Sequence, residues 1–281
     1  MNLLYGTYNP AKLESMIKML DGLDICITGL RNANMELKQA EETGKDPLSN
    51  ATQKAISYFH QIRKPLFSCD SELYFEGVDE KDQPGVLIKQ AYNNHAHERK
   101  DEVQEWKVGP RNKFLNFLKK EGKKNMLDIG AGNGRDSKFF MDNGFQVIAT
   151  DLSDEMVKIC KTKGIEAYEI DYYNLSHMNK TFDAIWAMNC LLHVRKADLE
   201  IVLEEIDKVL SPSGLFFMGI YGGEDKEGIW EEDIYTPHRF FLFYSDKKLR
   251  DILIKYFDLV SFDRIETGGK YYNQTIILRK R

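Results

Sequence analysis

The chain has 281 residues, of which 42% are hydrophobic and 30% are charged, and its formal net charge at pH 7 is -5. This composition is ordinary for a globular protein with enough apolar material for a core, and it excludes an intrinsically disordered chain. The acidic balance argues against nucleic acid as the main partner, because phosphate binding favours basic surfaces.

The sequence also indicates the cellular compartment in which we expect the protein. Its first residues lack the basic region and long apolar core of a signal peptide, and no apolar run is long enough to span a membrane. The four cysteines form no Cys-x-x-Cys pair, so neither a zinc ribbon nor a disulfide framework is indicated. We therefore expect a cytoplasmic protein with reduced thiols, no membrane contact and no bound metal.

The first ninety residues predict a small α/β domain. Apolar runs are typical of strands, and apolar residues at helical spacing predict helices between them. In chain order, we expect a strand at residues 3–5, a helix at 10–20, a strand at 23–28, a helix at 49–61 and a strand at 65–69. A turn-like or linker-like stretch at residues 80–85 closes this part. We therefore divide the chain into a domain of residues 1–90 and a second domain of residues 91–281.

The second domain begins with a polar joint, residues 91–108, which we expect to be helical in part. Pro110 predicts the first turn of a helix, where a missing N–H costs nothing. The apolar face of that helix consists of Phe114, Leu115, Phe117 and Leu118.

From residue 124 onward, strand and helix patterns alternate. Strands are expected at residues 125–129, 146–150, 166–170, 182–187 and 215–220, and helices at 135–142, 153–163 and 196–210. This alternation predicts a parallel sheet with right-handed crossovers. A helix at 245–257 and two strands around Gly268 and Gly269 then predict an antiparallel hairpin at the end of the sheet. The expected fold is an α/β, Rossmann-like sheet with that C-terminal hairpin.

Three alternating glycines, Gly130, Gly132 and Gly134, directly follow the strand at 125–129. Glycine permits positive φ and close approach of a ligand to the main chain. The dinucleotide-binding fingerprint needs a glycine at its sixth position, which is Arg135 here, so that fingerprint is excluded. Asp151 ends the next apolar run, where its carboxylate could accept both hydroxyls of a ribose.

The spacing Asp128-x-Gly130-x-Gly132-x-Gly134 resembles motif I of the class I S-adenosylmethionine-dependent methyltransferases. The resemblance covers about residues 92–281 and extends to three further motifs and the terminal hairpin. Those motifs are Thr150-Asp151-Leu152-Ser153-x-x-Met156, Phe182-Asp183-Ala184-Ile185-Trp186 and Leu210-Ser211-Pro212-Ser213-Gly214. The order and spacing of these pieces imply S-adenosyl-L-methionine as the cofactor.

This resemblance implies a set of residues around the cofactor. Asp128 would hold the ammonium end, directly or through water, and Asp151 would accept hydrogen bonds from the ribose hydroxyls. Leu152 and Met156 would flank the adenine, with Asp171 near its amino group. The other cofactor-binding residues expected are Tyr92, Gly130, Ala131, Gly132, Gly134, Tyr172, Met188 and Asn189. Tyr92 either closes over the cofactor or is an ordinary aromatic residue packed at the domain joint.

The acceptor would bind beyond the carboxyl ends of the strands, as ligands of open parallel sheets do. His193 is a candidate general base, since imidazole titrates near neutral pH, or else a structural residue. Proximity and alignment alone can supply much of the acceleration of a methyl transfer. The segment 221–241 either shapes an acceptor pocket or is a solvated acidic loop. Its pocket candidates are Tyr221, Trp230, Tyr235, His238 and Arg239, a mixture that suits a small, polar or cationic acceptor.

The N-terminal motif Tyr5-Gly6-Thr7-Tyr8-Asn9-Pro10-Ala11-Lys12 resembles the first motif of the inosine triphosphate pyrophosphatase family. The resemblance covers about residues 3–90, half of that family's fold, and implies a vestigial phosphate site of Thr7, Asn9, Lys12 and Asp70. Ser49 stands where the family has a metal-binding glutamate, and Cys69 replaces the first aspartate of a later motif. With Asp70 as a single carboxylate, metal-assisted hydrolysis is poorly supported, so we expect a degenerate domain.

These observations predict a methyltransferase that uses S-adenosyl-L-methionine and acts on a small-molecule acceptor. Two alternatives stay open at this point. One is a nucleotide-sensing or scaffolding protein with a cofactor-binding domain, and the other is a residual nucleoside triphosphate pyrophosphatase. A homodimer is compatible with each of them.

Overall fold

A computed structural model describes residues 2–8, 10–33, 37–38, 40, 47–69 and 87–281 of the chain. The chain divides into two compact units, residues 1–88 and 89–281, which are described separately.

The N-terminal unit is a small α/β structure around a three-stranded parallel sheet with the order β2-β1-β3. Its elements are β1 (Asn2–Tyr5), α1 (Pro10–Met19), β2 (Cys26–Gly29), the 3-10 helix η1 (Leu30–Ala33), α2 (Pro47–Ile62) and β3 (Leu66–Phe67). Tyr5 stacks on Phe67 with ring centroids 4.9 Å apart, and a second cluster joins Leu30, Tyr58 and Ile62. The expected α/β character of this unit is confirmed.

The larger unit is built on a seven-stranded sheet with the order β11-β12-β8-β7-β4-β5-β6. Its strands are β4 (Asn125–Ile129), β5 (Gln146–Asp151), β6 (Glu166–Glu169), β7 (Phe182–Met188), β8 (Leu210–Tyr221), β11 (Phe257–Ile265) and β12 (Asn273–Lys280). Strands β4 to β8 pair in parallel, and β12 pairs antiparallel with both β8 and β11. The predicted parallel sheet with an antiparallel terminal hairpin is therefore confirmed.

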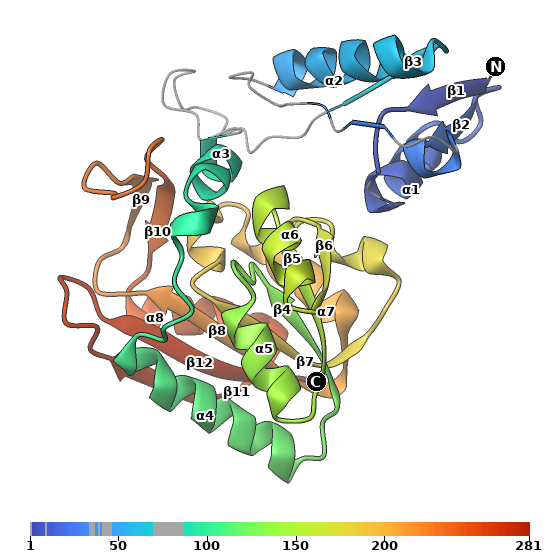
Figure 1. Cartoon of the computed structure of the whole chain (residues 1–281). Helices are drawn as coiled ribbons and strands as arrows, with labels where there is room; N and C mark the ends of the chain where they lie inside the picture. The colour runs from blue at the N-terminus through green and yellow to red at the C-terminus, as the bar shows by residue number, and fades with distance from the viewer. Residues whose placement is uncertain (1, 9, 34–36, 39, 41–46, 70–86) are drawn as a thin grey trace. The chain divides into compact units, whose positions relative to one another are not determined.

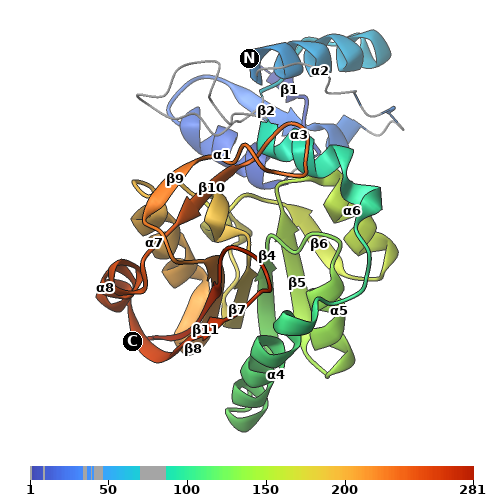
Figure 2. The ribbon, with the colours of Figure 1, turned by 90° about the vertical axis from the view of Figure 1, so that its left-hand side faces the viewer.

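Helices cover both faces of this sheet (Figures 1 and 2). One face carries α4 (Glu105–Lys120), α5 (Arg135–Asp142) and α6 (Asp154–Thr162), and the other carries α7 (Leu199–Val209) and α8 (Asp246–Tyr256). The core under α4 and α5 is aromatic: Trp186 stacks on Phe217 at 3.9 Å, and Phe114 and Phe140 pack against the pair. The five parallel strands thus end at one edge, where the ligand site of such a sheet is expected.

The helix predicted to open at Pro110 begins at Glu105 instead, with Pro110 inside it. The expectation that Pro110 marks the first turn is wrong, although the predicted apolar face is buried or packed on the core as expected. Burial of Phe114, Leu115 and Leu118 against the sheet compensates for the interior proline, which typically costs ~3 kcal/mol in a helix.

The rest of the larger unit surrounds the carboxyl edge of the sheet. It comprises α3 (Leu87–Asn94), the 3-10 helices η3 (Ala96–Glu98), η4 (Leu175–Met178) and η5 (Leu191–His193), and the strands β9 (Lys226–Ile229) and β10 (Phe240–Phe243). Strands β9 and β10 form an antiparallel pair within the segment 221–241. That segment is therefore a hairpin with a ten-residue connection, 230–239, rather than a plain loop.

Within the described ranges, no helix combines the length and the apolar composition that crossing a membrane requires. The same part of the chain holds no group of three or more His, Cys, Asp and Glu side chains placed to bind a metal ion.

Candidate functional site

The glycine loop between β4 and α5 has a conformation that demands its three glycines. Gly130, Gly132 and Gly134 have φ values of 63°, 58° and 75°, in the left-handed region that disfavours other residues. A Cβ atom on Gly130 would lie 2.3 Å from Cβ of Cys190, and one on Gly134 would lie 2.5 Å from Cδ1 of Ile165. The loop therefore runs close against its neighbours and leaves bare main chain at the carboxyl edge of the sheet.

Asp151 ends β5 directly beside this loop. Its Oδ2 accepts a hydrogen bond from the Gly132 N–H at 2.8 Å, and its Oδ1 accepts one from the Ser153 N–H at 2.9 Å. Burial raises the pKa of this carboxyl, and the two backbone N–H groups oppose that rise. Each carboxylate oxygen can accept further hydrogen bonds, so the residue suits the role expected from the sequence.

Asp128 lies within β4, beneath the loop, and is 2% exposed. Its Oδ2 accepts a hydrogen bond from Ser137 Oγ at 2.5 Å, and burial together with nearby Asp136 holds its pKa well above the usual range. Met156 is fully buried at the start of α6, and Asp171 accepts hydrogen bonds from Tyr173 N and from the side chain of Asn174. The structure thus spreads the expected cofactor residues along the ends of β4, β5 and β6.

The C-terminal part of α3 is tied to this edge. Lys89 lies 3.0 Å from a carboxylate oxygen of Glu169, and the Asn93 Nδ2 group donates to Asp154 Oδ1 at 2.8 Å. Asn93 also accepts a hydrogen bond from Ser153, the N-cap of α6. These contacts anchor the turn of helix that carries Tyr92.

Tyr92, His193 and Arg239 form one buried hydrogen-bonded network. His193 Nδ1 lies 2.6 Å from the carbonyl oxygen of Phe240, which can only accept, so Nδ1 carries the proton. Nε2 then accepts the hydrogen bond from Tyr92 Oη at 2.6 Å, while Arg239 Nη1 donates to the same Tyr92 oxygen at 2.9 Å. Burial, with Arg239 nearby, lowers the pKa of His193 to about 3. The imidazole is therefore neutral, with both nitrogens engaged.

Arg239 is itself held by an ion pair with Asp233, and both residues lie in the connection between β9 and β10. The guanidinium donates from Nε and Nη2 to the two carboxylate oxygens at 2.8 and 2.7 Å. Its plane lies over the ring of Tyr235, 4.1 Å from the centroid, and Tyr235 stacks on His95 at 4.5 Å. Burial raises the pKa of Asp233, but the hydrogen bonds from Arg239 outweigh it and lower that pKa overall. The pair holds the hairpin against η3.

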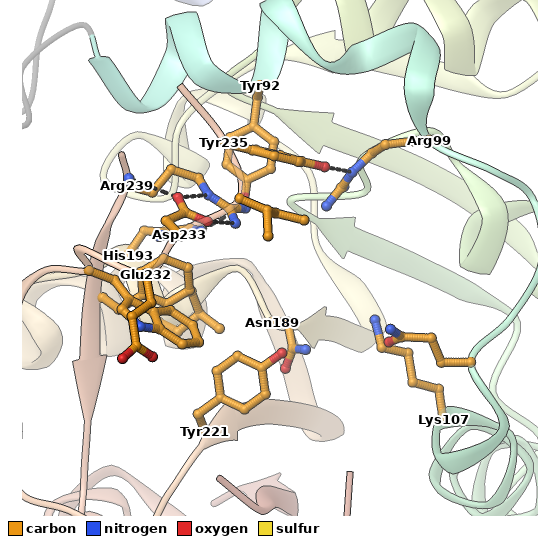
Figure 3. A pocket seen from close by; sticks show the side chains of 15 residues that line it. Tyr92, Arg99, Lys107, Asn189, His193, Tyr221, Glu232, Asp233, Tyr235 and Arg239 are labelled. Carbon is orange, nitrogen blue, oxygen red and sulfur yellow. Dashed lines mark hydrogen bonds and ion pairs between the residues drawn. The ribbon is translucent and has the colours of Figure 1, made fainter. Parts of the chain in front are cut away.

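These elements enclose a cavity of about 370 Å³ (Figure 3). The volume is within the range of small-molecule sites. Seven residues expected from the sequence line it, namely Tyr92, Asn189, His193, Tyr221, Trp230, Tyr235 and Arg239. His238 is exposed and is not among the residues that line this cavity, so its expected role in the acceptor pocket stays a prediction.

The cavity also has lining residues that sequence reasoning missed. Arg99, Gln104 and Lys107 come from the joint and the first turn of α4, and Asp233 and Phe241 come from the hairpin. Arg99 lies over the glycine loop: a Cβ atom on Gly132 would lie 2.8 Å from its Nη1. The only signal for these residues was the density of charge in the joint, which is equally typical of a solvated segment.

A model of a methyltransferase domain matches residues 127–218, which include the glycine loop, Asp151 and His193. Residues 127–218 form a methyltransferase domain. The resemblance inferred from the glycine spacing is therefore confirmed. The methyltransferase domain contributes Asn189, Leu192 and His193 to the cavity, and the other lining residues flank it in the chain.

A second model, that of the Ham1 family, matches residues 3–113. This confirms the likeness of the N-terminal part to the inosine triphosphate pyrophosphatase family. The match extends past residue 90, where the sequence placed its end, and includes α3 and half of α4. In the N-terminal unit, Thr7 follows β1 and Lys12 lies in α1, whereas Asn9 and Asp70 fall outside the described residues. Their grouping into a phosphate site therefore stays a prediction.

Curated relatives match about a third to two fifths of this chain. A ubiquinone biosynthesis O-methyltransferase of Xanthomonas oryzae is 32% identical over 100 residues, 33% of this chain and 41% of that protein. A probable tRNA methyltransferase 9B of Homo sapiens is 27% identical over 114 residues, 40% of this chain and 25% of that protein. The chain thus spans less than half the length of these relatives.

Solved structures share the fold. A 1,6-didemethyltoxoflavin-N1-methyltransferase of Burkholderia thailandensis is 19% identical, with a TM-score of 0.56 over 69% of this chain and 88% of that one. A magnesium protoporphyrin IX methyltransferase of Synechocystis is 14% identical, with a TM-score of 0.54 over 74% of this chain and all of that one. The first of these structures holds S-adenosylhomocysteine, and the second holds S-adenosylmethionine.

Proposed function

We propose that this chain transfers a methyl group from S-adenosyl-L-methionine to a small-molecule acceptor bound in the 370 Å³ cavity. The observation that carries the proposal is the continuity of the site. Arg99, which lines the cavity, lies over Gly132, and Cys190, next to Asn189 of the lining, lies against Gly130. The buried carboxylate of Asp151 accepts a hydrogen bond from the Gly132 N–H of the same loop.

The residues at the loop suit the parts of that cofactor. Asp151 would hold the ribose hydroxyls, and the left-handed glycines would let the methionine portion lie against the main chain. Arg99, held above Gly132, is a countercharge for the carboxylate of the methionine portion. When bound, the cofactor supplies an activated methyl group on a sulfonium.

The residues on the acceptor side of the site act by enclosing and orienting the acceptor. His193 is a poor general base in this arrangement, because its Nε2 already accepts from Tyr92 and its pKa is about 3. The network instead fixes Tyr92 and Arg239 as a rigid wall of the cavity. Alignment of an acceptor against that wall is the main contribution that these residues make to catalysis.

Several features favour a small molecule over RNA as the acceptor, although some relatives are named as tRNA methyltransferases. The cavity lies under α3, η3 and the β9–β10 hairpin, and Glu231 and Glu232 on that hairpin are exposed. An acidic rim repels a phosphate backbone.

We also propose that the protein works in a reducing cytoplasm, because its four cysteines are free thiols. We place the boundary between its two domains near residue 90.

Calorimetry of the full chain with S-adenosylhomocysteine tests the proposal. We expect binding, and Asp151→Ala should weaken it ~10-fold or more, because a charge-assisted hydrogen bond contributes ~1.5–3 kcal/mol. His193→Ala should weaken it less, and Asp142→Ala, which removes an exposed carboxylate from the end of α5, should leave it unchanged. Absence of binding at millimolar concentration would overturn the cofactor assignment, and the reverse order of the two variants would overturn the site map.

A further inference from the structure

Lys107 is a cation that lines the cavity without a carboxylate partner. It lies in the first turn of α4, is half-buried, and packs its ammonium group 5.1 Å from the ring centroid of Trp106. Among the described residues, no carboxylate oxygen lies within 4.0 Å of its Nζ. By contrast, Arg239 on the opposite wall is fully engaged with Asp233.

The charges around Lys107 do not neutralise it. Arg135 and Arg99 are like charges nearby. Asp136, whose opposite charge acts on Lys107, is already bound by Arg111 at 3.1 Å and lies 4.0 Å from Arg135. Burial, together with these arginines, lowers the pKa of Lys107 to about 8. A ligand anion would relieve this excess of positive charge.

Lys107 lines the same cavity as Asn189 and Tyr221. Its side chain extends from α4 toward Asn189 (Figure 3), which directly follows β7, and Tyr221 ends β8. Asn189 has a left-handed backbone with φ of 56°, and its Oδ1 accepts from Asn273 Nδ2 at 2.8 Å, which leaves its own amide N–H groups for a ligand. Strands β7 and β8 lie on the opposite side of β4 from β5, where Asp151 is.

Another part of the cavity wall is aromatic. Trp230 and Phe241 meet edge to face at 4.8 Å, and Tyr221 stacks toward Phe243 at 6.3 Å. Such surfaces suit a flat ring. An acceptor that fits would place a ring against them and a negative substituent toward the amide of Asn189 and the ammonium of Lys107.

We propose that the methyl acceptor is a small aromatic anion, such as an aryl carboxylate, whose charged group binds Lys107. The naming of this ligand as the methyl acceptor rests on the proposed function. The binding of an aromatic anion at Lys107 does not depend on it. It departs from the cationic option in the expectation of a small, polar or cationic acceptor, which was drawn from the aromatic residues and carboxylates of segment 221–241. In the structure, Asp233 is neutralised by Arg239 and Glu231 is exposed, whereas Glu232 is exposed and also lines the cavity, on the β9–β10 connection rather than on the helix that carries Lys107.

The test compares benzoate with benzamide, which has nearly the same shape and no charge. Both are titrated into the full chain saturated with S-adenosylhomocysteine, and binding is followed by NMR. We expect benzoate to bind at least ~10-fold more tightly than benzamide. Lys107→Gln should abolish that difference and leave benzamide unchanged. Lys107→Arg should keep it, and Lys120→Gln, which removes an exposed charge from the last turn of the same helix, should not alter it.

A pH series gives a second readout. Because the pKa of Lys107 is about 8, benzoate binding by the wild type should weaken as the pH rises from 7 to 9, as the ammonium is lost. Lys107→Arg should bind equally at both pH values, since guanidinium stays charged. The charged and titratable groups facing this position, Arg99, Arg135, Asp136, Tyr221 and Glu232, are unchanged in the variant.

Three results would overturn the proposal. Equal affinity for benzoate and benzamide would show that no anion is selected. A benzoate preference that survives Lys107→Gln would place the anion elsewhere. Loss of S-adenosylhomocysteine affinity in Lys107→Gln would assign Lys107 to the carboxylate of the methyl donor. If the wild type fails to bind S-adenosylhomocysteine, the proposed function fails, and the benzoate comparison is then made on the unloaded chain, where it tests the anion site by itself.

Discussion

At the scale of single residues, His193 shows how burial changes the role of a titratable group. Its two ring nitrogens are committed to Phe240 and Tyr92, and only one tautomer fits both contacts. The imidazole is 4% exposed and lies near the Arg239 guanidinium, so a proton added to it would meet both desolvation and repulsion. Its contribution is therefore to hold Tyr92 and the hairpin, and it makes the stability of the domain pH-dependent.

The pH dependence has a definite sign. Unfolded histidine binds a proton below about pH 6.5, whereas folded His193 stays neutral to about pH 3, so the unfolded state binds more protons between these values. Stability conferred by the neutral imidazole therefore falls as pH falls, by ~2 kcal/mol between pH 7 and pH 5. Urea unfolding followed by tryptophan fluorescence measures this, because all three tryptophans lie beyond residue 88.

The comparison needs two variants. His193→Gln should lose less stability than the wild type between pH 7 and pH 5, since glutamine does not titrate. His238→Gln removes an exposed histidine and should follow the wild type. Equal pH dependence in His193→Gln and the wild type would mean that the imidazole is not held neutral.

The sequence predicted the residues of the glycine loop and of segment 221–241 better than those of the joint, residues 91–108. Asp151, Asn189 and Tyr221 were predictable because each ends or directly follows a strand with a clear apolar pattern, at an edge where ligands bind. Arg99 and Lys107 were not, because a charged side chain in a polar segment has the same pattern whether it faces solvent or a cavity. Only the packing of α4 against the sheet decides that.

At the scale of elements, the glycine loop illustrates the difference between conformational strain and steric conflict. Gly130 and Gly144 both have positive φ values, of 63° and 91°. A Cβ atom on Gly130 would lie 2.3 Å from Cβ of Cys190, whereas one on Gly144 would have nothing within 4 Å. The two positions therefore separate the two costs of an added methyl group.

Gly144→Ala should destabilise the domain by ~1–2 kcal/mol, the cost of a left-handed alanine. Gly130→Ala should add a further ~1–3 kcal/mol of overpacking and should also weaken S-adenosylhomocysteine binding, because β4 and η5 must move apart. Thermal unfolding and calorimetry of both variants provide the check. Similar losses in the two variants would contradict the close approach of the loop to Cys190.

The errors at this scale have a common cause. Pro110 and the β9–β10 hairpin were misread because local signals were stronger than long-range ones in those segments. A proline favours a helix start, but the apolar stripe of α4 buries well enough to extend the helix five residues earlier. Strand β9 has few apolar residues, and its pairing with β10 depends on contacts across ten residues of connection.

At the scale of the whole molecule, two family likenesses meet in one stretch of chain. The Ham1 match runs to residue 113, while the compact methyltransferase unit begins at Lys89. Helix α3, η3 and the start of α4 therefore belong to the Ham1 match, and Tyr92 of α3, Arg99 at the end of η3 and Lys107 of α4 line the cavity. The same segment therefore lies in the Ham1 match and in the compact unit that holds the cavity. We expect its side chains to bind ligands of the cavity rather than a triphosphate.

The same overlap bears on hydrolysis of nucleoside triphosphates. The Ham1-like part carries Ser49 and Cys69 where the resembled family has carboxylates, and a thiol or a hydroxyl is a weak ligand for Mg²⁺. The described residues contain no cluster of three metal ligands. We therefore expect the full chain, at micromolar concentration with Mg²⁺ or Mn²⁺, to release no pyrophosphate from inosine or xanthosine triphosphate. An active member of the pyrophosphatase family assayed in parallel is the control, and metal-dependent release by this chain would restore the hydrolase as its second activity.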